Sequence, residues 1–276
     1  MCCREARASG VPGSIAMIPS MKACHLLRAC FVLWAVLLQP QFFVFALAPH
    51  NAGSKVPFVG CRSDGQTGPL KAPRAELKKV AIPAEIAGHL AYYKAQDGFG
   101  VLAPRGWHCF ATYGSNGVNL YVTPAQIKGP ELLSSGWKGF SGQAIQVSES
   151  IGDTSGRFAV AQTIARVFPD RKDFVDRVVS EGVEPAASFP SGAYPTDKLT
   201  YRWKHAVEFE TPPDAKGLGT DSKLLVNGSP VRGVAILFGQ EPSLVKASVR
   251  LPSDSLVLTK AIINQLENEV RAAGRP

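Results

Sequence analysis

The chain has 276 residues, of which 45% are hydrophobic and 19% are charged, and its formal net charge is +8. This composition lies far from the low hydrophobicity and high charge of disordered chains, so the protein can bury a sizeable core. The basic residues are dispersed, and the longest basic cluster is Lys78-Lys79, which disfavours a nucleic-acid partner.

Residues 1–48 have the pattern of a secretory leader. A positive stretch begins at about Met21, and an uncharged, largely apolar region follows from residue 29 to residue 48. It ends in Ala46-Leu47-Ala48, the small-x-small pattern at which signal peptides are cleaved. We therefore predict export and a mature chain that begins near Pro49. An uncleaved membrane anchor is the alternative, because residues 29–48 are just long enough to span a bilayer.

Cleavage would change both the charge and the cysteine content of the chain. The leader contains four basic residues and one acidic residue, so the net charge would fall from +8 to +5. Of the six cysteines only Cys61 and Cys109 would remain. An even pair in an exported domain predicts a disulfide. The alternative is a catalytic or metal-bound thiolate, although His108 and Cys109 would point to opposite faces of an extended strand and could not pair with each other.

The mature chain is expected to begin with an extended segment. Residues 49–75 are rich in Pro, Gly and polar residues and predict a loop-like segment ahead of a globular domain at 76–276. Residues 107–113 and 118–123 alternate around Gly114-Ser115-Asn116-Gly117, which predicts a β-hairpin with a four-residue loop. A short strand is expected at 143–147.

Two adjacent helices are expected in the middle of the chain. The first is predicted over residues 157–167 and is stopped by Pro169. Asp170 is a suitable N-cap for a second helix that ends near Ser180.

Strands and a final helix are expected in the last third. Residues 201–209 alternate between apolar and polar and predict one strand with a buried face that includes His205. Asn227-Gly228 predicts a hairpin turn between strands at 223–226 and 231–238. A strand at 244–251 and an amphipathic helix at 254–272 would complete the chain. The pattern as a whole favours a single α+β domain with a mainly antiparallel sheet, hairpins, two adjacent mid-chain helices and a C-terminal helix.

No motif in the sequence specifies a reaction. The Gly pairs at 98–100 and 217–219 lack the third glycine or the Gly-Lys-Ser/Thr ending of a phosphate loop. The histidines have no spacing typical of metal ligands, so neither a metal nor a cofactor is predicted.

The densest binding potential lies just before Cys109. Arg105 can hold a carboxylate or phosphate, Trp107 offers a stacking face and His108 titrates near neutral pH. These three residues are the candidate binding residues. The alternative is a strand entry whose tryptophan packs in the core beside the disulfide.

Two stretches of the chain resemble a family of exported bacterial proteins of unknown function. The residues concerned are Gly60-Cys61-Arg62-Ser63-Asp64-Gly65-Gln66 and the pattern G-V-L-A-P-R-G-W-H-C over residues 100–109. Where the family pattern has proline after the first cysteine, this chain has Arg62. The resemblance implies export and pairing of the two cysteines, and it supplies no activity.

The sequence therefore predicts an exported accessory or binding protein, periplasmic or at the cell surface, whose partner is an envelope component or another protein. Contact with a membrane would come only through an uncleaved leader. The rival hypothesis is a secreted hydrolase with a site assembled from His205, Glu208 or His108, and Ser141. For His205 the alternative is a hydrogen-bonded core histidine, and for Glu208 a solvated strand charge.

Overall fold

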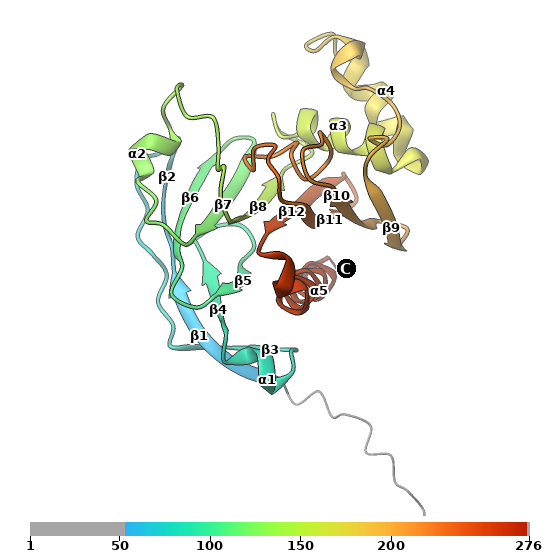
Figure 1. The fold of residues 1–276 in the computed structure, drawn as a ribbon. Helices are drawn as coiled ribbons and strands as arrows, with labels where there is room; N and C mark the ends of the chain where they lie inside the picture. The colour runs from blue at the N-terminus through green and yellow to red at the C-terminus, as the bar shows by residue number, and fades with distance from the viewer. Residues whose placement is uncertain (1–52, 275–276) are drawn as a thin grey trace, which may run out of the picture. The chain divides into compact units, whose positions relative to one another are not determined.

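The computed structural model describes residues 53–274, which belong to one compact unit. In this part of the chain the backbone forms two β-sheets, five α-helices and short 3-10 turns (Figure 1). The predicted α+β class is confirmed, with mainly antiparallel pairing, two adjacent mid-chain helices and a C-terminal helix. The predicted leader at 1–48 and its membrane-anchor alternative lie outside the described residues.

The smaller sheet has four strands in the order β3-β1-β4-β5. β1 pairs in parallel with β4, while the other two pairings are antiparallel. A short helix, α1, precedes β4. The bounds of these elements are β1 Ser54–Gly60, β3 Leu77–Val80, α1 Ala84–Ala87, β4 Leu90–Lys94 and β5 Val101–Pro104.

The larger sheet has eight strands in the order β2-β6-β7-β8-β12-β11-β10-β9. All neighbours in it are antiparallel except β2 and β6. The strands are β2 Arg62–Gly65, β6 His108–Gly114, β7 Gly117–Thr123, β8 Ala144–Ser150, β9 Lys198–Trp203, β10 Ala206–Thr211, β11 Val231–Phe238 and β12 Ser243–Arg250.

Helices cover both faces of the larger sheet. The C-terminal helix packs against its β11–β12 region and against β5 of the smaller sheet, with Ile262, Leu266 and Val270 fully buried. The two mid-chain helices pack on the other face, over Val207 and Leu237. The bounds are α2 Gly129–Leu132, α3 Arg157–Val167, η1 Pro169–Arg171, α4 Lys172–Ser180, η2 Ala186–Ser188, η3 Ser253–Ser255 and α5 Leu256–Ala273.

The two sheets are joined at the disulfide. Cys61 alone separates β1 from β2, so the chain passes from the smaller sheet to the larger one at this residue. Cys61 is bonded to Cys109 of β6, with the two Cα atoms 5.4 Å apart, which confirms the predicted bridge. A loop of 48 residues closed in this way stabilises the fold by about 4 kcal/mol on the chain-entropy account.

The segment at 49–75 is more regular than its composition indicates. Its described part, residues 53–75, contains the strands β1 and β2 where a loop is predicted. Pro and Gly weaken local preference for a strand, whereas pairing with β4 and β6 supplies the backbone hydrogen bonds that a loop would leave to water.

The predicted single strand at 201–209 is wrong. β9 ends at Trp203 and β10 begins at Ala206, so the chain turns back on itself at Lys204 and His205. The alternation continues through the turn in the sequence but does not mark one face, since Val207 and Phe209 pack with α3 and α4 whereas Trp203 packs with α5. His205 therefore lies at a turn and not on a strand face.

The predicted hairpin at Asn227-Gly228 is also wrong. Residues 223–226 form no strand, and Leu224 makes only an isolated parallel bridge to Phe140. The side chains of Asn227 and Arg250 hold this segment in a different way. Asn227 donates to the carbonyl of Ser141, and the buried Arg250 donates to the carbonyl of Leu225. A local turn remains, because the amide of Ser229 donates to Asn227 Oδ1 at 2.9 Å, but no pair of strands flanks it.

The start of the second mid-chain helix is displaced from its predicted position. α3 has the predicted bounds, but Pro169 begins the 3-10 turn η1, and α4 starts only at Lys172. Asp170 lies inside η1 and does not cap α4. Proline favours the first position of a helical turn because its φ is already fixed near the helical value.

Candidate functional site

The three predicted binding residues lie beside the disulfide, where two of them share a groove. Trp107 is half-buried against the core, and with His108 it lines a groove of ≈ 560 Å³ that also includes Arg62 and Asp64. Arg105 is exposed in the turn between β5 and β6 and does not line this groove. The structure thus brings Trp107 and His108 together and leaves Arg105 outside.

The residues of the hydrolase hypothesis are far apart. His108 begins β6, the second strand of the larger sheet, whereas His205 precedes β10, the seventh. Five strand spacings separate them, which corresponds to about 24 Å. Ser141 lies in an exposed loop, and no cavity described for residues 53–274 is lined by two of His108, Ser141, His205 and Glu208.

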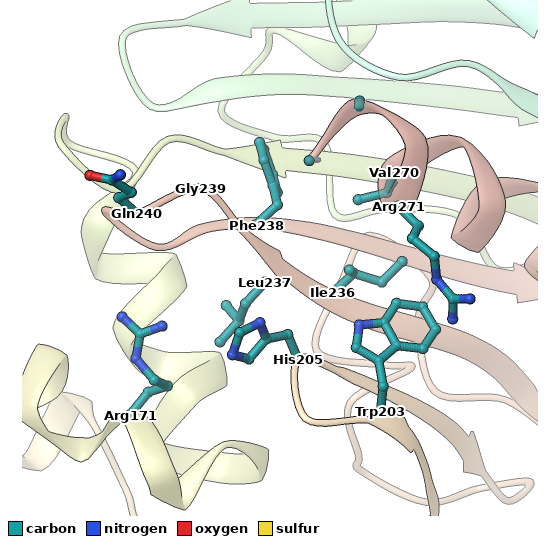
Figure 2. A pocket seen from close by; sticks show the side chains of 12 residues that line it. Arg171, Trp203, His205, Ile236, Leu237, Phe238, Gly239, Gln240, Val270 and Arg271 are labelled. Carbon is teal, nitrogen blue, oxygen red and sulfur yellow. The ribbon is translucent and has the colours of Figure 1, made fainter. Parts of the chain in front are cut away.

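A different pocket lies where the β9–β10 hairpin, the end of β11 and the C-terminal turn of α5 meet. Its volume is ≈ 590 Å³, within the range of small-molecule sites. In Figure 2, His205 lies between Arg171 on one side and Trp203 with Arg271 on the other. The complete lining is Arg171, Trp203, His205, Ile236, Leu237, Phe238, Gly239, Gln240, Val270, Arg271, Ala273 and Gly274. We call this the basic pocket.

Backbone contacts fix the rim of the basic pocket. The amide of Leu237 donates to the carbonyl of His205 at 2.8 Å, which ties the β9–β10 turn to β11. Gly239 has φ +79°, a left-handed conformation that lets the chain turn sharply from β11 towards β12. On α5, the amide of Gly274 donates to the carbonyl of Val270 at 2.8 Å and ends the helix beside the pocket.

A β-bulge shapes the wall next to α5. The β9–β10 register shifts between Ala206 and Val207. As a result two consecutive residues of β9 reach α5: Arg202 contacts Glu267, and the Trp203 ring lies 4.1 Å from the guanidinium carbon of Arg271. A regular strand would send one of these neighbours to the other face. The bulge therefore places an aromatic plane and a cation together in the pocket wall.

The lining combines an apolar floor with positive charge. Six of the lining side chains are apolar or aromatic: Trp203, Ile236, Leu237, Phe238, Val270 and Ala273. Arg171 and Arg271 carry the charges, and no carboxylate belongs to the lining. The nearest acidic partner of Arg171 is Asp173, at 4.0 Å from its Nε, which is the limit of an ion pair. Both guanidinium groups thus keep hydrogen-bond donors for a ligand.

His205 adds a neutral polar group to the basic pocket. Burial of the ring, together with the positive charges of Arg171 and Lys204, lowers the pKa of His205 below its usual value of 6.5. The imidazole is therefore uncharged at pH 7 and offers one donor and one acceptor. An anion bound between the two arginines would raise this pKa again, because it would stabilise the protonated ring.

Only part of the basic pocket could be predicted from the sequence. His205 and Trp203 belong to the alternating segment 201–209, whose pattern predicts that the two side chains lie close together. Arg171 and Arg271 lie in distant helical segments and carry no local signal that links them to this strand. The bulge that turns Trp203 towards Arg271 has no sequence signature either, because it arises from the pairing of two strands.

A third feature is an aromatic cluster on the β6–β8 side of the larger sheet. The rings of Tyr121, Trp137 and Phe140 lie 5.2–5.6 Å apart, and Lys223 lies 5.2 Å from the Trp137 ring. The three rings pack directly against one another. Among residues 53–274, no described cavity is lined by Trp137, so the cluster is a packing feature of the loops over this sheet.

Neither a metal cluster nor a membrane-spanning helix is found in the described part of the chain. Within residues 53–274, no group of three or more His, Cys, Asp or Glu side chains is arranged to hold a metal ion. No helix in this range has both the length and the apolar composition needed to cross a bilayer. Comparison with known proteins found no match among family models, curated proteins or solved structures.

Proposed function

We propose that this protein is an exported binding protein that holds a small organic anion in the basic pocket. The observation that carries this proposal is the pairing of Arg171 and Arg271 with an apolar floor in a pocket whose lining contains no carboxylate. Arginine donates in a planar fork that matches carboxylate, sulfonate and phosphate groups. The ligand class is therefore an anionic headgroup attached to an aromatic or aliphatic body.

Export is supported by the disulfide. Bridges of this kind persist in oxidising compartments and are rare in the cytosol. Together with the leader pattern of residues 1–48, the bridge favours the periplasm or the cell surface. The anion would then be an envelope component or a molecule that passes through this compartment.

We also propose membership in the family of exported bacterial proteins that the sequence resembles. The two stretches that carry the resemblance adjoin each other in the fold: Cys61 and β2 belong to the first, and β5 with Cys109 to the second. The disulfide joins them. A pattern shared over two segments that one bridge holds together is consistent with a common fold for such proteins.

Binding is favoured over hydrolysis by the placement of the candidate catalytic residues. A nucleophile and its base must lie within hydrogen-bond reach, or within one water of it. His205 shares the basic pocket with two arginines and Trp203, but with no serine, cysteine or carboxylate. This arrangement can hold an anion, and it offers no group for His205 to activate.

The proposal is tested with two probes that share an aromatic body and differ in charge. Residues 49–276, with the disulfide intact, are titrated with anilinonaphthalene sulfonate and with the uncharged N-phenylnaphthylamine, followed by fluorescence. Arg171→Gln and Arg271→Gln should each weaken binding of the sulfonate about tenfold, since a hydrogen bond to a charged group contributes about 1.5 kcal/mol. Affinity for the uncharged probe should stay nearly constant.

Arg74→Gln is the matched control, because Arg74 is exposed and lies outside the basic pocket. It makes the same change of net charge and should leave both affinities unchanged. Equal loss of sulfonate binding in all three variants would mean that overall charge, and not the pocket, attracts the probe, and the proposal would fail. Loss of both probes in the pocket variants would indicate collapse of the site and would be checked against thermal unfolding.

A further inference from the structure

The larger sheet ends in β9, whose outer edge is open in the described structure. Among residues 53–274, the β9 backbone makes hydrogen bonds only to β10. The opposite edge of the same sheet is covered: Ser63 of β2 exchanges backbone hydrogen bonds of 2.8 and 3.4 Å with Leu70. An uncovered edge presents a row of donors and acceptors to which another extended chain can pair.

An apolar hollow lies on the α3–α4 side of β9. Its volume is ≈ 470 Å³, and Tyr201 of β9 forms one wall with 55% of its surface exposed. The Tyr201 hydroxyl donates to the carbonyl of Val167 at 3.0 Å, which fixes the ring against the end of α3. The other apolar lining residues are Ile164, Ala165, Pro169, Val175, Val179, Ala186, Phe189 and Ala193. Three ionisable residues, Arg166, Lys172 and Asp176, also line the hollow, and Lys172 pairs with Asp176 at 2.8 Å.

A charged hollow lies on the α5 side of the same strand. Its volume is ≈ 360 Å³, and its ionisable lining residues are Lys198, Glu208, Glu210, Arg232 and Lys260. Two ion pairs lie here: the Nε of Arg232 is 2.7 Å from a carboxylate oxygen of Glu210, and the Nε of Arg202 is 3.1 Å from one of Glu208.

The two lysines of this charged hollow are at most weakly paired with carboxylates. Lys198 lies 3.8 Å from Glu210, and its side chain is 82% exposed. Lys260 makes no ion pair among residues 53–274. This side of β9 is therefore net positive.

We propose that β9 is a docking site for an extended segment of a partner protein in which apolar and acidic residues alternate. A strand added to β9 would present successive side chains to opposite faces of the sheet. One set would enter the apolar hollow beside Tyr201. The other set would face Lys198 and Lys260. The two hollows share no lining residue with the basic pocket, although Trp203, the last residue of β9, lines that pocket.

Charge argues against two other occupants. In an antiparallel pairing of two copies centred on Thr200, Lys198 of each copy would oppose Arg202 of the other, and like charges directly opposite are destabilising. The chain's own N-terminal residues 1–52 contain Glu5 as their single acidic residue, so they cannot supply alternating carboxylates. A separate acidic and apolar partner segment fits both faces.

The test uses a labelled peptide of about eight residues in which Val and Glu alternate, with binding to residues 49–276 followed by fluorescence anisotropy. Lys198→Glu combined with Lys260→Glu should weaken this peptide at least about tenfold, as expected for reversal of two exposed ion pairs. A peptide of alternating Val and Lys should then bind the charge-reversed variant better than it binds the original protein. This gain cannot come from misfolding.

Two controls separate the outcomes. Lys71→Glu combined with Lys138→Glu, at exposed positions outside both hollows, should leave binding of the Val–Glu peptide unchanged. A peptide with the same composition, in which all the Val residues precede all the Glu residues, should bind weakly. Only an alternating sequence places Val on one face of the sheet and Glu on the other. The proposal is overturned if the blocked peptide binds as well as the alternating one, if the charge-reversed variant keeps its affinity, or if residues 49–276 form a dimer that the lysine variants alter.

Discussion

Glu267 is a buried carboxylate one helical turn before Arg271 on α5. Only 6% of its side chain is exposed, and its Oε2 atom lies 3.7 Å from the Nε of Arg202. Burial and the negative charge of Glu208 together raise the pKa of Glu267 to about 7, although Arg202 and Arg271 act in the opposite direction. The residue is thus poised to lose its proton near neutral pH, close to the wall of the basic pocket.

This pKa makes the stability of the fold depend on pH. The folded chain keeps the Glu267 proton up to about pH 7, whereas the unfolded chain releases it near the ordinary value of 4.5. The folded state therefore binds more protons in this window, and its stability falls as pH rises through it. In Glu267→Gln this contribution is absent. Between about pH 5 and about pH 8, the free energy of unfolding should fall on the order of 1–3 kcal/mol more for the original protein than for the variant.

Chemical denaturation at several pH values measures this difference. Glu131→Gln, which removes a carboxylate whose side chain is 65% exposed, is the control and should follow the original profile. Parallel profiles for the original protein and Glu267→Gln would show that Glu267 is already ionised in the folded state throughout the range.

At the scale of elements, the Cys61–Cys109 bridge joins the two sheets where the chain crosses between them. Gly60 cannot carry a side chain here, because a Cβ atom would meet the carbonyl oxygen of Pro73 at 2.0 Å. The bridge and this close approach fix the segment after the predicted leader against β6. The groove that Trp107 and His108 line lies beside this bridge and also includes Cys109.

The bridge and export are tested together by intact-mass measurement. Protein released from the producing cell and kept under non-reducing conditions should begin near Pro49 and be two hydrogens lighter than its reduced form. A chain that retains residues 1–48 would support the membrane anchor. Two alkylatable thiols would show that the mature protein does not carry the bridge in its own compartment.

Elements with a strong local period could be predicted, and those set by tertiary contacts could not. The helix at 157–167 and the β6–β7 hairpin follow from spacing within the segment itself. The predicted four-residue loop is wrong, because Gly114 pairs with Gly117 and leaves only Ser115 and Asn116 between the strands. The β9–β10 turn is invisible because its two strands continue one alternation. The segment around Asn227 has a strong turn signal, but no pair of strands flanks it, and the buried Arg250 and the carbonyl of Ser141 bind it instead.

At the scale of the whole molecule, the basic pocket is assembled from separate segments that lie between Arg171 and Gly274. Arg171 comes from η1, His205 from a hairpin turn and Arg271 from the last turn of α5. The larger sheet positions all three, since α5 covers one of its faces and α3 with α4 the other. A local motif cannot encode such a site, which is why Arg171 and Arg271 could not be predicted.

The described chain contains three tryptophans, and each reports on a different feature. Trp107 lines the disulfide groove, Trp137 belongs to the aromatic cluster and Trp203 forms the wall of the basic pocket. Their indole N–H groups give separate NMR signals, so one titration can locate a bound anion among the three.

The most direct test of the account is this titration with anilinonaphthalene sulfonate, carried out on residues 49–276. The Trp203 indole signal should shift progressively and saturate together with the fluorescence, while the signals of Trp107 and Trp137 stay in place. A saturating shift of Trp107 or Trp137 with Trp203 unmoved would place the anion elsewhere and contradict the assignment of the basic pocket as the binding site.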